Sequence, residues 1–226
     1  MRSVRKTAMK EKADKKKQRQ DSSIICSAAI SRRISFIIFE NIIGFIMAMK
    51  TYRGTFLFWK DPASNLGTFY TAGQQFNGAS ALFFDLTMLI SCVAMLQIAR
   101  RFTQDIPFKH KKTKQVLSAL CALGFFLVVF PYPVYMMLHR IGASFVIGGL
   151  WGLSTLFSVE VKPFISSHLF YFYQFLLQGS ILTYAFLYLT GLPGDEIAQK
   201  FGITSLMIVL WFTTRSRTRD KQIVYG

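Results

Sequence analysis

The stretch DPASNLGTFYTAGQQFNGASALFFDLTML, residues Asp61 to Leu89, decides how the rest of the chain is arranged. Its first half is polar and contains turn-forming pairs such as Asp61-Pro62. Its second half is a long apolar run that predicts a helix, with one carboxylate, Asp85, near the middle. The stretch therefore predicts a polar loop that leads directly into a helix embedded in a bilayer.

The remaining sequence repeats this alternation of apolar runs and polar connections. The chain has 226 residues, of which 52% are hydrophobic, and its charged residues cluster at the two ends and in one central segment. A helix needs about 17–25 mostly apolar residues to cross a bilayer. The apolar runs predict six spans, at residues 34–50, 76–98, 116–130, 141–159, 169–189 and 197–212.

These spans predict an all-α, polytopic membrane protein with a transmembrane domain over residues 34–214. Six spans place both ends of the chain on one side, together with the central segment and Lys162. That side then holds 22 Lys and Arg residues, and the other side holds five. Because positive residues accumulate in cytoplasmic segments, both termini are predicted to be cytoplasmic. Residues 1–33 and 215–226 are predicted to be basic cytoplasmic tails.

The net charge of +16 is explained by this topology and does not require a nucleic-acid partner. Residues 1–20 carry a run of Lys and Arg with no apolar face, which predicts a solvated tail that anionic lipid could also attract. Membrane lipid is therefore the first expected partner. Other membrane subunits, or a second copy of the chain, are further expected partners.

Two sets of residues are predicted to join helices inside the membrane. Ser144, Gly148 and Gly152 recur every four residues in the fourth span, and the last two form a GxxxG pattern that is typical of close helix packing. Gln174 and Gln178 lie one turn apart in the fifth span and are expected to form hydrogen bonds across helices.

No pattern in the sequence predicts a catalytic, metal or cofactor site. The three histidines are His110, His139 and His168, and the predicted topology places His139 on the side opposite the other two. This separation disfavours heme held by two histidines, and no spacing typical of a zinc site is present. Phosphate-binding loops and nucleophile motifs are also missing from the sequence. The sequence therefore favours a protein without enzymatic activity.

The polar residues that open toward the outer side form a candidate site. Ser64 and Asn65 lie in the first outer loop, Asn77 and Asp85 follow down the second span, and His139 lies at the top of the fourth span.

Asp85 lies about 13 Å below the outer boundary of its span, at a depth that Glu40 of the first span could reach. One interpretation is a proton-linked site or a pocket for a polar ligand. The alternative is a pair of structural acids, each hydrogen-bonded to a neighbouring helix.

The loop and the second span together resemble a known group. Ser64-Asn65-Leu66-Gly67, followed by Phe76-Asn77 at the head of a helix, resembles the prokaryotic six-span proteins of unknown function allied to the DRAM/Frag family. His139 near the start of the fourth span fits the same pattern, whereas Asn65 replaces the acidic residue usual in the loop motif. The resemblance implies six helices and no established catalytic activity. The eukaryotic relatives of that group are linked to autophagy, membrane-lipid organisation and lipid-anchor maturation.

These observations favour a non-enzymatic membrane protein that packs with, or organises, lipids or partner membrane proteins. A small proton-coupled transporter that uses Asp85 and Glu40 is the first alternative. An accessory subunit of a larger membrane complex is the second, and the packing pattern in the fourth span favours it. A membrane-embedded enzyme is a further alternative for which no nucleophile and base are visible.

Overall fold

The computed structural model describes residues 28–103 and 109–223 of this chain. Within this part the chain is all-helical and has no strand beyond one isolated bridge between Tyr70 and Phe76, which confirms the predicted fold class. The elements are an N-terminal helix Ala28–Thr51, η1 Ala63–Gly67, α2 Gly78–Thr103, α3 Lys111–Val128, α4 Met136–Val161, η2 Lys162–Phe164, α5 Ser167–Gln174, the π-helical η3 Phe175–Gly179, α6 Ser180–Thr190 and α7 Asp195–Ile223.

Within the described residues, four helices are long and apolar enough to cross a membrane. They cover Ala28–Thr51, Gly78–Thr103, Met136–Phe164 and Asp195–Ser216. The other two predicted spans are also helical, but α3 begins with a cluster of lysines, and the helical run 167–190 is divided by the π-helical turn η3. Length and composition therefore fit an integral membrane protein with at least these four helices.

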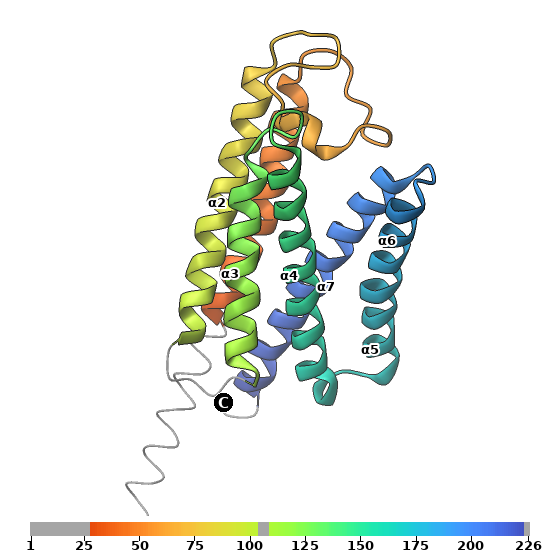
Figure 1. Ribbon diagram of the computed structural model, residues 1–226. Helices are drawn as coiled ribbons and strands as arrows, with labels where there is room; N and C mark the ends of the chain where they lie inside the picture. The colour runs from red at the N-terminus through yellow and green to blue at the C-terminus, as the bar shows by residue number, and fades with distance from the viewer. Residues whose placement is uncertain (1–27, 104–108, 224–226) are drawn as a thin grey trace, which may run out of the picture.

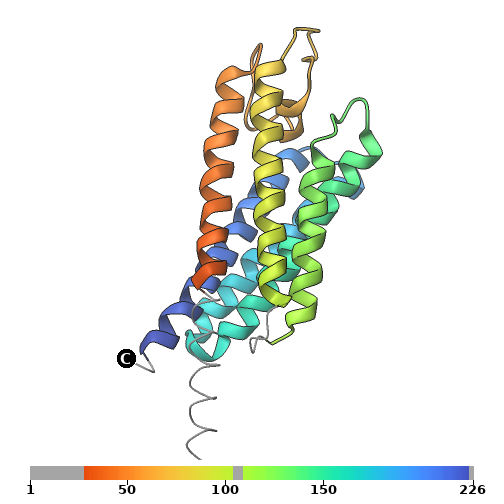
Figure 2. The ribbon, with the colours of Figure 1, turned by 90° about the vertical axis from the view of Figure 1, so that its left-hand side faces the viewer.

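Figure 1 shows the N-terminal helix, α2, α3 and α4 standing side by side, with α7 crossing them obliquely. In the view of Figure 2 the N-terminal helix and α2 lie next to each other, followed by α3. The continuous run α5–η3–α6 lies at the far edge and packs against α7. The N-terminal helix begins, and α7 ends, at the same end of the bundle.

The helices extend further at both ends of the chain than the sequence predicts. Arg33, predicted to lie in the N-terminal tail, is inside the first helix and donates hydrogen bonds to the Gln97 side chain of α2 and to the Ala29 carbonyl oxygen. At the other end α7 continues through Ile223, into the segment predicted to be a tail. That segment holds Arg, Lys and Gln, which are good helix formers, and it has no proline. The run of basic residues at 10–19 lies outside the described residues.

Glycines bring α3 and α4 into close contact, but they differ from those predicted. A Cβ on Gly124 would lie 2.6 Å from the Gly142 carbonyl oxygen, and one on Gly142 would lie 2.7 Å from Leu127 Cβ. Gly149 faces Cys121 and the Leu117 carbonyl of α3 in the same way. These distances leave no room for a side chain, so backbone contacts backbone along this interface.

The predicted packing residues divide between two faces of α4. Gly152 does contact α3, since a Cβ there would lie 2.9 Å from a Leu117 methyl carbon. Ser144 and Gly148 lie on the exposed face, and a Cβ on Gly148 would have no neighbouring atom within 4 Å. Gly148 therefore contacts no neighbouring helix among the described residues, and the packing role of Ser144 and Gly148 stays a prediction. Small residues do recur once per turn along α4, but Ser144 and Gly148 face away from α3.

An ion pair joins the opposite end of the same two helices. Lys114 Nζ lies 2.5 Å from Glu160 Oε1, and the Lys114 side chain has 0% exposed area. Lys114 also lies over the Phe157 ring, 4.1 Å from its centre. The sequence placed Lys114 in a solvated cytoplasmic segment, whereas the first turn of α3 buries it. The difference arises because Glu160, the penultimate residue of α4, supplies the opposite charge.

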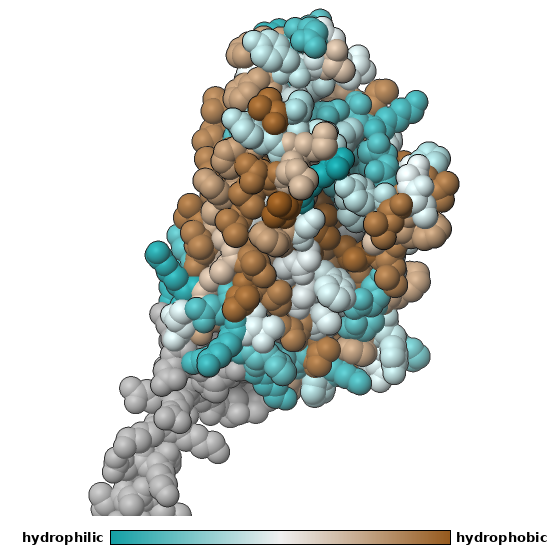
Figure 3. Space-filling model, viewed as in Figure 1, coloured by the Kyte–Doolittle hydropathy of each residue, from teal (hydrophilic) through white to brown (hydrophobic). Residues whose placement is uncertain are grey.

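The outer surface of the bundle is strongly apolar. Phe39 and Ile43 of the N-terminal helix are 61% exposed, and Val93 of α2, Phe175 of η3 and Phe186 of α6 are also exposed. Figure 3 shows hydrophobic residues over most of the middle of this face and hydrophilic residues at its ends. Such a belt is far larger than the apolar patches of soluble monomers and is typical of a surface that faces lipid.

Candidate functional site

The outer loop, residues 52–77, is fixed by the buried side chain of Asn77. Its Nδ2 donates to the Thr68 carbonyl at 2.9 Å, and its Oδ1 accepts from the Arg53 backbone N–H at 3.1 Å. The Asn77 backbone N–H donates to the Phe69 carbonyl at 2.7 Å. Asn77 has 0% exposed area, so its side chain is fully occupied with holding the loop against the start of α2.

The Ser64-Asn65-Leu66-Gly67 motif forms the turn η1, which sits on α2. Leu66 is 1% exposed, and its carbonyl accepts a hydrogen bond from Ser80 Oγ at 2.9 Å. A Cβ on Gly67 would lie 2.5 Å from the Phe84 ring, so only glycine fits there. The Asn65 carbonyl accepts from the Thr68 backbone and hydroxyl groups. The motif therefore closes the outer end of the bundle, and Ser64 and Asn65 lie half-buried within it.

His139 performs a similar task at the hairpin between α3 and α4. The side chain is 7% exposed, its Nδ1 lies 3.0 Å from the Phe130 carbonyl oxygen, and its ring packs edge-on against Tyr132. The structure thus uses His139 to fasten the hairpin. The polar residues predicted to form an outer site are therefore divided. Asn77 holds the outer loop and His139 holds the α3–α4 hairpin, so these residues do not converge on one ligand position.

Glu40 and Asp85 both lie in membrane helices but have different surroundings. Glu40 Oε2 accepts hydrogen bonds from Asn41 Nδ2 and Ser91 Oγ, both at 3.0 Å, which joins the N-terminal helix to α2. Asp85 precedes Ser91 by six residues, about 9 Å along the helix axis. The partner of Glu40 on α2 is therefore Ser91, and Asp85 lies well above it.

Each of these acids keeps one buried oxygen without a hydrogen-bond partner among the described residues, Glu40 Oε1 and Asp85 Oδ1. An unpaired ionised oxygen in an apolar environment is costly, which favours the protonated form. Within the described residues no three His, Cys, Asp or Glu side chains lie close enough together to hold a metal ion. The arrangement of Glu40 and Asp85 can therefore hold protons but offers no metal-ligand set.

Gln174 and Gln178 connect the helical run α5–η3–α6 to α4. Gln174 Nε2 donates to Ser158 Oγ at 2.7 Å, and Gln178 Oε1 accepts from Trp151 Nε1 at 3.1 Å. Both bonds cross between helices, as the sequence predicts for these two glutamines. They lie on the part of the run where α4 contacts α5 and η3, and they close that part of the interface.

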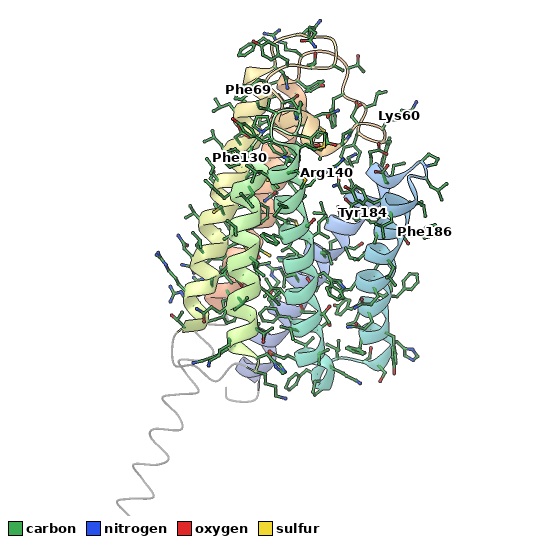
Figure 4. All side chains as sticks on the ribbon, viewed as in Figure 1. Lys60, Phe69, Phe130, Arg140, Tyr184 and Phe186 are labelled. Carbon is green, nitrogen blue, oxygen red and sulfur yellow. The ribbon has the colours of Figure 1, made fainter. Side chains whose placement is uncertain are left out.

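On the outer side of these two hydrogen bonds, α4 and α6 separate from each other. α6 leans on α7, whereas α4 stays upright, and the two diverge toward the outer end of the bundle (Figure 1). The exposed Ser144 and Gly148 lie on α4 on the outer side of Trp151. On α6, Tyr184 extends into the gap and Phe186 points away from it (Figure 4). We use the name α4–α6 groove for the surface formed by the exposed Ser144 and Gly148 of α4, Tyr184 of α6 and the Trp151–Gln178 bond.

The outer mouth of the α4–α6 groove is polar. Arg140 of α4 is exposed, and its Nη2 donates to the Tyr132 hydroxyl at 3.0 Å. Tyr184 Oη accepts from Gln199 of α7 at 3.4 Å. Figure 3 shows hydrophilic residues at this upper end and hydrophobic residues below them and to both sides. The surface therefore has a charged outer end, and polar groups lie along it within the apolar belt of the bundle.

Sequence reasoning did not identify this groove. The sequence gives Arg140 only as one of the five basic residues on the outer side, and it does not show that Ser144 and Gly152 face different ways. The signal that could have indicated it is the combination of exposed small residues with aromatic and amide side chains in the fifth span. Comparison with protein-family models, with curated proteins and with solved structures finds no match to this chain.

Proposed function

We propose that the protein is an integral membrane protein with six spans and cytoplasmic termini, and that it binds membrane lipid in the α4–α6 groove without catalysing a reaction. The six-span arrangement is supported by helices that alternate between the two ends of the bundle (Figures 1 and 2). It is also supported by the excess of 22 basic residues over five on the side that holds both termini. The kinship with DRAM/Frag-allied proteins stays a proposal, supported by the structural role of Leu66, Gly67 and Asn77.

The observation that carries the lipid proposal is the empty space beside Gly148. A side chain added there would meet no atom within 4 Å, although the residue lies in the middle of a helix inside the apolar belt. The bilayer fills any space that opens sideways to it, and at the depth of Gly148 it supplies acyl chains. The Trp151–Gln178 bond closes one end, so a chain would enter from the outer mouth.

The experiment is to fill the groove and count the lipid that stays bound. Gly148→Leu places a branched side chain in the space, where it has room without disturbing α3. Lipid molecules retained per protein would be measured by native mass spectrometry after mild detergent extraction. We expect Gly148→Leu to lose the most tightly held lipid. Ala119→Leu, on the exposed face of α3 away from the groove, is the matched control and should retain it.

Retention of the same lipid by Gly148→Leu would overturn the proposal. Purification of another protein chain in stoichiometric amount, released by Gly148→Leu, would instead indicate an accessory subunit whose helix occupies the groove. Both outcomes come from the same measurement, because native mass spectrometry separates added lipid masses from added chains.

A proton-coupled carrier is a second candidate function, which the unpartnered oxygens of Glu40 and Asp85 favour. On that hypothesis Asp85→Asn abolishes pH-dependent uptake into proteoliposomes, because an amide cannot exchange a proton at this depth. A proton flux equal to that of the unmodified protein would remove the carrier hypothesis. The lipid proposal does not depend on either acid.

A further inference from the structure

A short turn in the outer loop, residues 57–60, exposes three apolar side chains in succession. Leu57 is 49% exposed, Phe58 is 42% exposed and Trp59 is 64% exposed, and the next residue, Lys60, is also exposed. Single apolar residues on a surface are ordinary, but three in a row concentrate apolar area at one point. We call this segment the 57–60 turn.

The 57–60 turn has a defined shape, because its backbone is closed on itself. The N–H groups of Lys60 and Asp61 both donate to the Leu57 carbonyl, at 2.9 and 2.8 Å. The Asp61 side chain accepts from the Leu57 N–H at 2.6 Å. The Phe58 and Trp59 rings pack edge to face, with 4.9 Å between their centres. Backbone groups that are paired within the turn lose less when the turn leaves water.

Contacts with Lys200 of α7 fix the depth of the 57–60 turn. Lys200 Nζ donates to the Asp61 carbonyl at 2.7 Å and lies 5.3 Å from the centre of the Phe58 ring. The same Nζ lies 3.4 Å from the carbonyl oxygen of Glu196, which belongs to the first turn of α7. The 57–60 turn therefore lies at the level where α7 begins, and Figure 4 shows Lys60 on the side of the loop near that end of α7.

This level coincides with the outer boundary of the apolar belt. Ile197 and Phe201, in the first two turns of α7, are 44% and 58% exposed, and Leu189 near the end of α6 is 82% exposed. The helix that contains Ile197 and Phe201 is long and apolar enough to cross a membrane. Tryptophan is enriched at this boundary, and a lysine there extends its ammonium group toward the headgroups.

We propose that the 57–60 turn inserts into the headgroup region of the bilayer and docks the outer loop onto the lipid surface beside α7. Leu57, Phe58 and Trp59 meet the upper part of the acyl chains, and Lys60 meets lipid phosphate, which has the opposite charge. A lipid surface fits better than a protein partner, because the turn lies level with exposed apolar residues of α7. The inference goes beyond the proposed function and does not depend on the α4–α6 groove.

The test measures the depth of the 57–60 turn in lipid vesicles. The full-length chain, lacking Cys26, Cys92 and Cys121, would carry a fluorescent probe on Leu57→Cys. This change keeps the backbone bonds of the turn. A nitroxide near the headgroup end of an acyl chain should quench this probe several-fold more strongly than it quenches a probe on Ala72→Cys. Iodide in the water should give the reverse order, because Ala72 is exposed in the polar hairpin tip 71–75.

Two substitutions of Asp61 test whether the closed turn, and not apolar composition alone, sets this depth. Asp61→Ala removes the acceptor for the Leu57 N–H, so quenching by the lipid nitroxide should fall and quenching by iodide should rise. Asp61→Asn keeps an oxygen acceptor and is the matched control, with quenching close to that of the unmodified turn. Equal quenching in Asp61→Ala and Asp61→Asn would overturn the role given to the turn.

Two outcomes at Leu57→Cys would overturn the insertion itself. Iodide quenching equal to that at Ala72→Cys would place the turn in water. Protection from iodide without quenching by the lipid nitroxide would indicate a covering protein chain.

A second measurement leaves the cysteines in place. Trp59→Phe would be compared with the unmodified protein in vesicles of brominated lipid. The tryptophan emission lost in Trp59→Phe should be quenched more by bromine near the headgroup than by bromine near the chain end. The opposite order, or no quenching by either lipid, would contradict insertion at this boundary.

Discussion

The buried side chain of Asn77 connects two parts of the outer loop. Its amide joins Thr68, in the returning part of the loop, to Arg53, which follows the N-terminal helix. Because Asn77 is fully buried, truncation leaves the Thr68 carbonyl and the Arg53 N–H without partners. We expect Asn77→Ala to lower the free energy of unfolding by about 2–4 kcal/mol, measured in detergent by thermal or denaturant unfolding.

The control for this prediction is Gln75→Ala, two residues away in the same loop. Gln75 is exposed, and its hydrogen bonds to Thr71 use its backbone groups, so its truncation should change stability little. If Asn77→Ala and Gln75→Ala both had the same free energy of unfolding as the unmodified protein, Asn77 would not be the residue that fastens the loop.

The Lys114–Glu160 pair gives a second prediction at this scale. Removing one partner leaves a charge in a buried position, which costs about 3–5 kcal/mol in comparable pairs. Lys114→Met and Glu160→Gln should therefore each be strongly destabilising. The double variant should recover much of the loss, because no isolated charge remains. A double-mutant cycle of unfolding free energies checks this, and additive losses would show that the two residues act independently.

The residues of the outer loop show what a sequence pattern can and cannot provide. The sequence marks Ser64 to Gly67 and Asn77 as a motif, and the structure gives both parts a packing role. That role depends on Ser80, Phe84 and Arg53, whose positions relative to the motif follow only from the folded chain. The sequence places Glu40 and Asp85 at similar depths, whereas the hydrogen bond of Glu40 to Ser91 is seen only in the folded chain. The depth of a residue in the bilayer can be calculated from residue counts. The neighbouring helix that its side chain faces cannot be obtained in this way.

The α3–α4 interface is the element at which small residues have the largest effect. At Gly149 an added methyl group would meet Cys121 and would lie 3.1 Å from the Leu117 carbonyl oxygen, while at Gly148 it would meet nothing. Gly149→Ala should destabilise the protein by about 1–3 kcal/mol, since the neighbouring backbone has little room to move. Gly148→Ala should be neutral or slightly stabilising, because alanine favours helix.

These adjacent substitutions control for each other, since both add one methyl group to the same turn of α4. Unfolding in the same detergent, followed by circular dichroism, compares them directly. Equal effects would contradict the assignment of Gly149 to the interface and Gly148 to the groove. The comparison also explains why the GxxxG pattern misleads here. The pattern gives the spacing of small residues, whereas the interface is set by the direction that each one faces.

For the molecule as a whole, the all-helical class and the positions of the helices follow closely from hydropathy. Apolar runs of bilayer length leave few alternatives to helices, because backbone groups in lipid must bond within their own segment. The oblique course of α7 and the divergence of α4 from α6 do not follow from hydropathy. They result from contacts such as Ser154 Oγ with the Leu206 carbonyl and Trp211 Nε1 with Ser35, which involve residues far apart in sequence.

The topology itself gives the final prediction. Four of the helices meet the criteria for a span by length and composition, so the crossing of α3 and of the run 167–190 is the part to test. In a variant lacking Cys26, Cys92 and Cys121, single cysteines would be introduced at exposed positions. These are Gln75→Cys in the outer loop, Lys112→Cys at the start of α3, His168→Cys at the start of α5, and Leu192→Cys after α6.

Six spans with cytoplasmic termini predict that a membrane-impermeant maleimide labels Gln75→Cys and Leu192→Cys in intact cells. Lys112→Cys and His168→Cys should be labelled only after permeabilisation, because two crossings separate the central segment from the loop before α5. Equal labelling of His168→Cys and Leu192→Cys in intact cells would show that α5–η3–α6 does not cross. In that event Arg140 and the mouth of the α4–α6 groove would lose their lipid-facing position, since α6 forms one wall of the groove.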